Sequence, residues 1–215
     1  MTAHVASVNV GRVVQASWAG RPGQTAIDKA PVAGPVQVRR LGLVGDGVGD
    51  PRFHGGVHQA VYAFAREDLD HWGEQLGRPV RPGVFGENLT TVGVDLNATV
   101  LGERWRVGTA VLQPIDVRTP CTTFTTWLRR QGFDTTSWVR RFTQGGRPGV
   151  YLKVLQEGQV QAGDAVVVED RPAHGVTVAT MYAAYLTDRS RLPELLAVEG
   201  LAEHVYVAAR RQRDR

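Results

Sequence analysis

The sequence has one cysteine, very few lysines and no long apolar run, and each shortage excludes a class of protein. Cys121 stands alone among 215 residues, so the chain cannot form an internal disulfide, a multi-cysteine zinc site or its own iron–sulfur cluster. No apolar run approaches the ~20 residues that a membrane helix requires. The N-terminus lacks the basic and apolar regions of a secretory signal. We therefore expect a cytoplasmic protein without a membrane partner.

The positive charge of the chain is concentrated at its C-terminus. The formal net charge is +4, but four arginines and one aspartate among the last six residues account for +3 of it. Binding along a nucleic-acid duplex requires a basic face, and no interleaved stripe of basic and aromatic residues is present. We interpret the arginine-rich end as a solvated tail and expect no nucleic-acid partner.

Short apolar or alternating segments dominate the first 170 residues, and we expect most of them to be β-strands. Glycine, proline, asparagine and aspartate separate these segments, as is typical of turns. Hairpins are expected at Gly108-Thr109, at Glu157-Gly158 and around Gly163. Many short strands joined in this way favour a barrel or sandwich over a βαβ repeat. The expected strands span residues 5–14, 36–43, 60–65, 99–107, 110–117, 150–155 and 165–168.

Three helical segments interrupt the expected strands. Residues 66–76 carry apolar side chains at helical spacing, and Gly77 is a typical stop. A second helix is expected around Phe124, where Trp127 and Leu128 follow at helical spacing. In the third, Asp134 is the predicted cap and Gly145 the predicted end. The apolar face of this third helix comprises Trp138, Val139 and Phe142.

The periodicity becomes helical throughout after residues 169–175. Three short amphipathic stretches follow, with Ser190 as the predicted cap of the middle helix and Gly200 before the last. The sequence therefore predicts a mainly β fold: a barrel domain over residues 1–170 and a small three-helix unit over residues 174–212. Packing of this unit against the barrel and docking of a partner are both open roles.

The segment DPRFHGGVHQAVY, residues 50–62, gathers an arginine, two histidines and two glycines before an apolar run. His54 and His58 are four residues apart, as zinc ligands on a helix would be. However, Gly55 and Gly56 lie between them and argue against a helix. We therefore disfavour a dedicated zinc site and expect this turn to bind backbone groups or an anion. The glycine-rich residues 45–50 just before it are interpreted as a flexible turn.

Cys121 is preceded by residues that favour the start of a helix. Thr119 is the predicted cap, and Pro120 suits the first helical position, which would place the cysteine in the first turn. Free N–H groups and the helix dipole favour a thiolate there, and Arg118 adds a positive charge. An activated thiolate and an inert, buried thiol are equally compatible with these local features.

A second arginine of interest, Arg147, lies in the segment QGGRPGVYLKV, between an expected helix and an expected strand. It could present its guanidinium to an anion at the rim of the barrel. A plain connecting loop is the alternative, and the local residues favour that alternative.

Four segments taken together resemble the MOSC domain, which is named for the C-terminal part of molybdenum-cofactor sulfurase. Their order and spacing match over roughly residues 30 to 170, and the three-helix tail resembles the addition found on the YiiM-like branch of the family. One departure is that Asp116 and Val117 stand where the family usually has a small polar residue and proline. The segments are GLVGDGVGDPRFHGGVHQAVYAF, GVFGENLTTVGV, VLGERWRVGTAVLQPIDVRTPC and GRPGVYLKVLQEGQVQAGDAV.

The resemblance implies a β-barrel with a cleft for the molybdenum cofactor (molybdopterin). In the family the cysteine of the Pro-Cys element is the proposed ligand of molybdenum or sulfur, which here is Cys121. The cofactor's phosphate suits guanidinium groups and free N–H groups, and a soft thiolate suits molybdenum. The residues then expected to line the cleft are Arg52, His54, Gly55 and Gly56, with Glu87 and Asn88 near it and with Arg118 and Arg147 as further anion contacts.

The resemblance leaves three functions open. The first is an oxidoreductase that reduces small N-hydroxylated compounds to amines, with Cys121 holding molybdenum and His54 or Glu87 relaying protons. Because the chain has one cysteine and no flavin motif, a separate reductase would supply the electrons. The second is a non-catalytic carrier of the cofactor or of sulfur as a persulfide. The third is a barrel with an inert cysteine. The oligomeric state is also open, with a homodimer as one arrangement.

Overall fold

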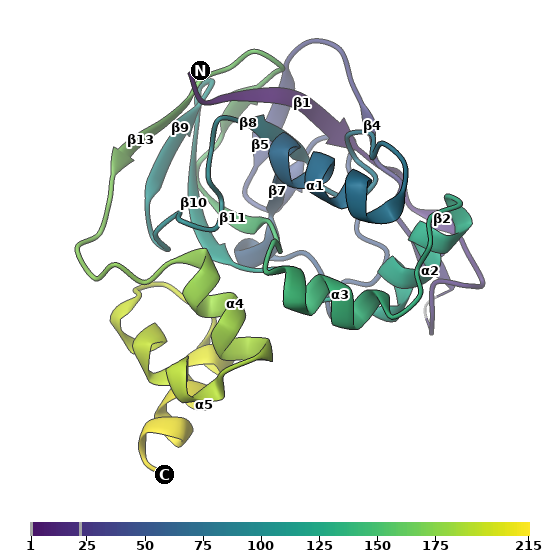
Figure 1. The fold of residues 1–215 in the computed structure, drawn as a ribbon. Coiled ribbons are helices and arrows are strands. Elements are labelled where there is room, and N and C mark those ends of the chain that lie inside the picture. The colour runs from purple at the N-terminus through teal and green to yellow at the C-terminus, as the bar shows by residue number, and fades with distance from the viewer. Residues whose placement is uncertain (1, 22) are drawn as a thin grey trace.

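A curled, eight-stranded sheet forms the main body of the protein (Figure 1). The computed structural model describes residues 2–21 and 23–215. All neighbouring strands in this sheet are antiparallel except β7 and β8, which run parallel. Backbone hydrogen bonds from Val5 to Asp164 (2.8 Å) and from Val166 to Ala3 (2.9 Å) partly close the sheet into a barrel. The strand order is β13 (Val166–Asp170), β9 (Arg104–Val107), β10 (Ala110–Asp116), β11 (Val150–Gln156), β7 (Val61–Ala65), β8 (Leu89–Val92), β1 (His4–Val10) and β4 (Ala30–Pro31).

Two small sheets lie beside the main one. The first joins β12 (Gly158–Val160), β5 (Val36–Arg39) and β6 (Gly42–Leu43), and the second pairs β2 (Val14–Gln15) with β3 (Gln24–Thr25). A 3-10 turn, η1 (Val57–Gln59), precedes β7. The segments before β7 line a large cavity.

The predicted mainly β fold is confirmed, whereas several predicted turns and strand lengths differ from the structure. The Gly108-Thr109 hairpin connects β9 and β10 as predicted. The turn at Glu157-Gly158 does not make a hairpin, because β12 leaves the main sheet and pairs with β5. The turn around Gly163 likewise leads from β12 to β13, which pairs with β9. Strand β8 was not predicted, because its sequence LTTV is short and partly polar.

Three helices cover one side of the barrel, namely α1 (Arg66–Leu76), α2 (Thr122–Arg130) and α3 (Trp138–Gly145). Their aromatic side chains pack into one cluster: Trp72 stacks on Phe142 at 5.5 Å, and Phe124 meets Trp138 edge-on at 5.6 Å. Helix α3 begins later than predicted. Asp134 accepts a hydrogen bond from the Thr136 amide (2.9 Å) in a separate turn and does not cap the helix.

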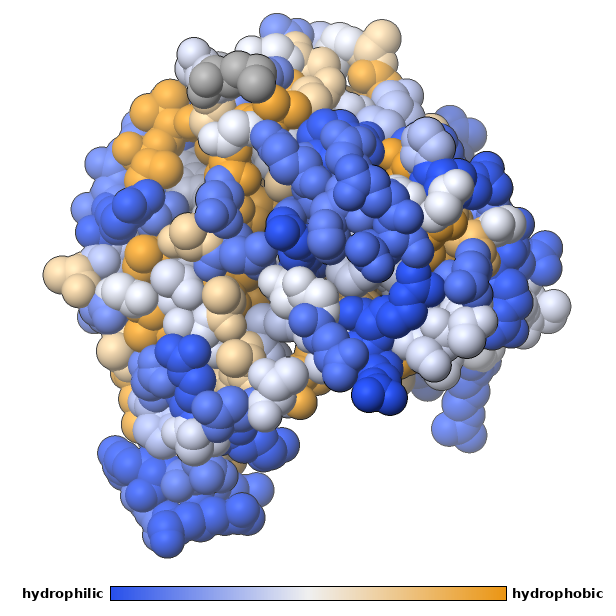
Figure 2. Space-filling model, in the orientation of Figure 1, coloured by the Kyte–Doolittle hydropathy of each residue, from blue (hydrophilic) through white to orange (hydrophobic). Residues whose placement is uncertain are grey.

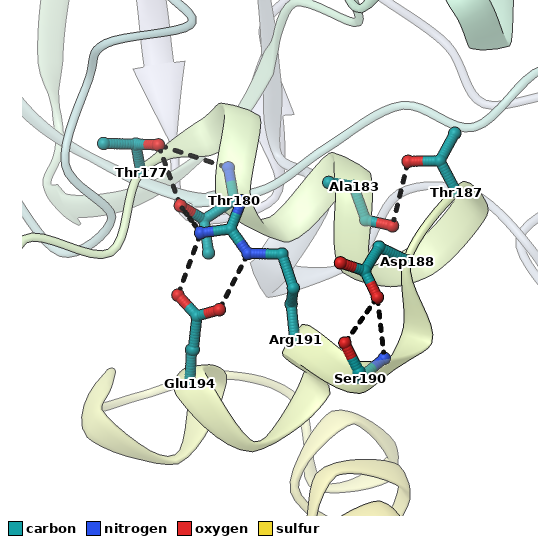
Figure 3. Close-up of polar contacts among 8 residues, drawn as sticks. All are labelled: Thr177, Thr180, Ala183, Thr187, Asp188, Ser190, Arg191 and Glu194. Carbon is teal, nitrogen blue, oxygen red and sulfur yellow. Dashed lines mark hydrogen bonds and ion pairs between the residues drawn. The ribbon is translucent and has the colours of Figure 1, made fainter.

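The C-terminal unit consists of α4 (Val178–Leu186), the 3-10 segment η2 (Arg189–Ala197) and α5 (Glu203–Arg213). Its middle element is not an α-helix, and Pro193 inside it lacks the N–H group that an α-helix would use there. Asp188, and not the predicted Ser190, caps this segment by accepting from the Ser190 amide (3.1 Å). Figure 3 shows Arg191 reaching both carboxylate oxygens of Glu194 (2.7 and 3.0 Å) and the Thr180 hydroxyl (3.4 Å).

The C-terminal unit packs directly against the barrel. The Val178 amide donates to the Thr99 carbonyl (2.9 Å), and the Tyr182 hydroxyl donates to the Phe142 carbonyl (3.0 Å). The buried apolar residues of α4, η2 and α5 belong to the same hydrophobic cluster as the barrel core. Figure 2 shows a mostly hydrophilic face, with apolar groups gathered where β13 lies and hydrophilic ones at the end of α5. Within residues 2–21 and 23–215, no helix is long and apolar enough to cross a bilayer.

Candidate functional site

A cavity of about 810 Å³ opens where the segments before β7 meet the loop that follows β10. A volume of this size lies within the range of small-molecule sites, roughly 300–1,000 Å³. Its wall includes the loop between β6 and η1, the strand residue Tyr62 and the start of α2. Segments far apart in the sequence therefore meet around one chamber, which is the arrangement that a binding site requires.

Arg118 is the most unusual residue in the cavity wall, because its side chain is buried without a carboxylate partner. Among the residues that the structure describes, no aspartate or glutamate forms an ion pair with it. The guanidinium lies over the rings of Phe124 (4.1 Å) and Tyr62 (5.4 Å) and donates to the Phe85 carbonyl. A buried charge is costly unless something compensates for it. This geometry therefore suits an anion bound in the cavity.

Cys121 lies in the same wall and is half-buried. The structure corrects the predicted start of α2: Cys121 itself is the cap, and Thr119 and Pro120 precede the helix. The thiol sulfur accepts a hydrogen bond from the Phe124 amide at 3.4 Å. The sulfur therefore lies at the N-terminus of α2, in the wall of the same cavity as Arg118. Because the residue lines the cavity, it is not sealed in the apolar core.

Arg52, His54 and Gly55 line the cavity as the sequence predicted. Arg52 is exposed, and its guanidinium donates two hydrogen bonds of 2.8 Å to the carboxylate of Asp50. Partial burial at the cavity wall lowers the pKa of His54, the charge of Arg118 lowers it further, and Asp50 opposes both. Its imidazole is therefore neutral at pH 7. Gly56 is exposed and does not line the cavity.

A buried polar network in the wall was missed from the sequence. Lys29 forms an ion pair with Asp46, and both side chains are largely buried. Asn88, a predicted site residue, donates to Asp46 (2.8 Å), as does the Gly11 amide (2.8 Å). Burial lowers the pKa of Lys29, and its partner Asp46 opposes that shift. Two features of the sequence could have indicated this pair. Lysine is rare in the chain, and Asp46 lies in the glycine-rich residues 45–50, which we interpreted as a flexible turn.

Glu87 lies between the wall residues Gly86 and Asn88 but does not itself line the cavity, so its carboxyl is not placed for the predicted proton relay. It is fully buried behind the wall, where it accepts hydrogen bonds from the Gly83 amide (2.5 Å) and the Thr90 hydroxyl (3.0 Å). Its other carboxylate oxygen has no hydrogen-bond partner among the described residues. Burial raises the pKa of this carboxyl, and the hydrogen bonds oppose the shift. Its position makes it a structural support for the loop before β8.

Arg147 also lies outside the cavity. Its guanidinium pairs with Asp68 on α1, so its charge is already compensated. The sequence could not distinguish the two arginines, because the partner of Arg147 is 79 residues away along the chain. Asp116 and Val117, where the sequence departs from the family pattern, do not line the cavity either. Asp116 instead accepts a hydrogen bond from the wall residue Gln59 (3.2 Å).

Tyr151 is a further wall residue that the sequence did not reveal. Its ring packs on that of Tyr62 at 4.8 Å. Burial raises the pKa of Tyr151, and the charge of Arg118 opposes that shift. Its hydroxyl is therefore protonated at neutral pH and can donate a hydrogen bond.

The cavity lining carries an excess of positive charge. The basic residues are Arg21, Lys29, Arg39, Arg52 and Arg118, and the acidic ones are Asp46 and Asp50. This excess favours a negatively charged guest. Across the part of the chain that the structure describes, no cluster of three or more histidine, cysteine, aspartate or glutamate side chains is placed to hold a metal ion.

Comparisons with known proteins agree with this architecture. A family model described as "MOSC domain" matches residues 50–167. The chain is 32% identical over 174 residues to the uncharacterized protein YflK of Bacillus subtilis, covering 81% of this chain and 76% of that protein. It is 30% identical over 197 residues to protein YiiM of Escherichia coli, covering 88% and 84%. The crystal structure of YiiM from Geobacillus stearothermophilus superposes with a TM-score of 0.78 at 26% identity, over 98% of each chain.

One similar protein is much longer. A Gibberella moniliformis protein named "Reductase" is 27% identical over 171 residues, which are 77% of this chain but only 29% of that protein. In that fungal chain, the region similar to this protein is therefore joined to a larger remainder.

Proposed function

This chain belongs to the MOSC domain family, and from that premise we propose that its cavity binds the molybdenum cofactor and reduces N-hydroxylated compounds to amines. The observation that carries the proposal is the pairing, in one chamber, of an accessible sulfur with a buried guanidinium that has no carboxylate partner among the described residues. Arg118 and Cys121 both line it. A phosphorylated pterin that carries a metal offers an anion to the first and a ligand site to the second.

The residues present fit that guest in charge and in donor chemistry. Arg118 and the exposed Arg52 can donate to phosphate oxygens, and Gly55 lets the backbone approach the guest closely. The buried pair of Lys29 and Asp46 adds a second polar patch to the wall. Cys121 supplies the single soft ligand that the described chain offers in this cavity. Glu87 and Arg147 have no role in the proposal, because neither lines the chamber.

The reaction is a two-electron reduction. One N-hydroxylated molecule, two electrons and two protons give one amine and one water, with cleavage of the N–O bond. The bound cofactor would supply a metal centre that passes electrons in pairs. The chain's own residues would hold the substrate and move protons: His54 can take up and release a proton at its imidazole, and Tyr151 can donate a hydrogen bond from its phenol. Because the chain has one cysteine and no flavin motif, we expect a separate reductase to supply the electrons.

The test is elemental and pterin analysis of protein made in a host that synthesises the cofactor. Wild type is compared with Cys121→Ser, because serine is also a good helix cap and should preserve the start of α2. We expect one molybdenum per wild-type chain and a large loss in the variant. Equal, near-zero metal in both would contradict the proposal.

Turnover separates the enzyme from a carrier. Loss of a simple amidoxime is followed with reduced methyl viologen as the electron source, so that no protein partner is needed. Loaded wild type should convert the amidoxime to the amidine, and Cys121→Ser should not. Metal-loaded protein without turnover would instead indicate a carrier of the cofactor or of sulfur.

A further inference from the structure

We propose that the rim of the cavity is the docking surface for an acidic electron-transfer protein. We define this cavity lip as the apolar residues Val13, Val14, Leu41, Val44 and Phe53 together with the arginines Arg12, Arg21, Arg39, Arg40 and Arg52. The proposal rests on the proposed function, since it concerns how electrons reach the same chamber.

Exposed apolar side chains gather at the lip. The structure exposes nine large apolar residues among those it describes, and five of them belong to the lip. Leu41, Val44 and Phe53 line the cavity and are 62%, 56% and 72% exposed. Val13 borders them, because a Cβ added at the wall residue Gly47 would lie 2.7 Å from its Cγ2 atom. Contiguous apolar exposure of this kind marks an interaction site.

The net positive charge of the lip favours an acidic partner. Arg39 pairs with Glu157 and Arg52 with Asp50, which leaves a net positive charge on the rim. Within the described residues, Arg12, Arg21 and Arg40 form no ion pair at all. A second copy of this chain fits poorly, because a symmetric contact through the lip would oppose the same positive charges.

The chemistry of the chamber indicates why the partner should carry electrons. Six of the ten lip residues line the cavity that holds Cys121, so a donor that docks on the lip comes near the reacting centre. Because Cys121 is its one cysteine, the chain cannot ligate an iron–sulfur cluster of its own to relay electrons. Electron-transfer complexes are small and transient. A lip that combines a few exposed apolar side chains with several arginines suits such a small contact.

The similar fungal protein named "Reductase" carries the matched region as 29% of a longer chain. A domain of this type can therefore be linked covalently to further protein.

The test uses the full-length protein and a plant-type ferredoxin, a small acidic iron–sulfur protein, as the probe. Binding is measured by titration calorimetry at about 0.01 M and about 1 M salt, where the Debye length falls from about 30 Å to about 3 Å. The lip variant is Arg40→Glu combined with Val13→Ser, neither of which lines the cavity. The matched control is Arg211→Glu combined with Val167→Ser, which makes the same changes of charge and polarity away from the lip.

We expect the lip variant to weaken ferredoxin binding at low salt by about tenfold or more, and the control to change it by less than about twofold. High salt should weaken wild-type binding strongly. Ferredoxin-driven reduction of the amidoxime should fall in parallel, while viologen-driven reduction stays unchanged. The viologen assay therefore reports on the proposed function and the binding assay on the lip.

Three outcomes would overturn the docking proposal. The first is equal binding of ferredoxin to wild type and to the lip variant. The second is a dimer of the free protein in analytical ultracentrifugation that the lip variant dissolves. The third is tighter, lip-dependent binding of a DNA 20-mer or of vesicles containing anionic lipid, which would assign the rim to a nucleic acid or to a membrane surface.

Discussion

The cavity wall and the C-terminal unit differ in whether their charged side chains are buried or exposed. In the C-terminal unit apolar side chains such as Leu195 are buried, and its ion pair between Arg191 and Glu194 stays at the surface. In the cavity wall the buried side chains include Arg118 and the pair of Lys29 and Asp46. A buried charge costs free energy unless a partner compensates for it, and Arg118 has no carboxylate partner among the described residues. The contrast indicates which of the two regions is shaped by a ligand.

The largest effect on stability is expected from alanine substitutions at two glycines, which compare how tightly the two regions are packed. Gly83 and Gly200 both have positive φ, so alanine at either costs about 1–2 kcal/mol. A Cβ at Gly83 would also lie 2.2 Å from the Lys29 carbonyl oxygen, whereas at Gly200 the nearest atom is Lys153 Nζ at 4.0 Å. Overpacking adds about 1–3 kcal/mol. Urea unfolding should therefore show Gly83→Ala to be the more destabilising by that margin, and equal losses would remove the contrast in packing.

The next effect concerns the two arginines that the sequence could not tell apart. Arg118→Gln should lower the affinity for the cofactor by about 10- to 100-fold, because a hydrogen bond to a charged group is worth about 1.5–3 kcal/mol. Arg147→Gln should leave cofactor content unchanged, since Arg147 is committed to Asp68. Pterin and molybdenum content under limiting supply of the cofactor provides the readout. Loss of cofactor in the Arg147 variant alone would reverse our assignment of the site.

A smaller effect should appear in the pH dependence of stability. Burial raises the pKa of Glu87 above its ordinary value of 4.5, so the folded chain holds that proton more tightly than the unfolded chain does. The stabilisation from this group is therefore present below pH 4.5 and is lost as the pH rises through the raised pKa. Glu87→Gln has no such titration. The unfolding free energy of wild type should fall relative to that of the variant as the pH rises from 4.5. Parallel curves would show that Glu87 is not held protonated by its burial.

The smallest effect is expected at the surface of the C-terminal unit. Arg191→Ala removes the ion pair between Arg191 and Glu194, in which the two side chains are 38% and 43% exposed. Loss of such an exposed pair should lower the free energy of unfolding by about 0–1 kcal/mol. Thermal unfolding at low and high salt measures it. A loss comparable to that of a core substitution, roughly 2–5 kcal/mol, would mean that this unit also depends on its polar contacts.

Local sequence rules predicted most of the fold. Alternation located β7, β10 and β11, and the glycine after residues 66–76 marked the end of α1 correctly. Helix starts were less predictable, because several polar residues lie close together before α2, α3 and η2. The true caps or flanking residues, Cys121, Ser137 and Asp188, each lie within three residues of the predicted ones.

The site was predictable where a residue's role is local and not where it depends on a distant partner. Arg52, His54 and Cys121 are marked by their immediate neighbours, and all three line the cavity. Lys29 carries no local mark, because its partner Asp46 lies 17 residues further along the chain. Glu87 was misplaced for the converse reason: its motif places it beside Asn88, but the backbone turns its carboxyl away from the cavity. Whether such residues line the cavity depends on tertiary contacts, which the local sequence does not show.

The sulfur atom of Cys121 performs two tasks at once, because it begins helix α2 as well as facing the chamber. Whatever engages the lone pairs of that atom makes it a weaker acceptor for the hydrogen bond that the Phe124 amide donates. Alkylation or metal ligation should therefore loosen the first turn of the helix. The Phe124 amide thus serves as an internal gauge of occupancy, readable by hydrogen exchange or by its nitrogen chemical shift.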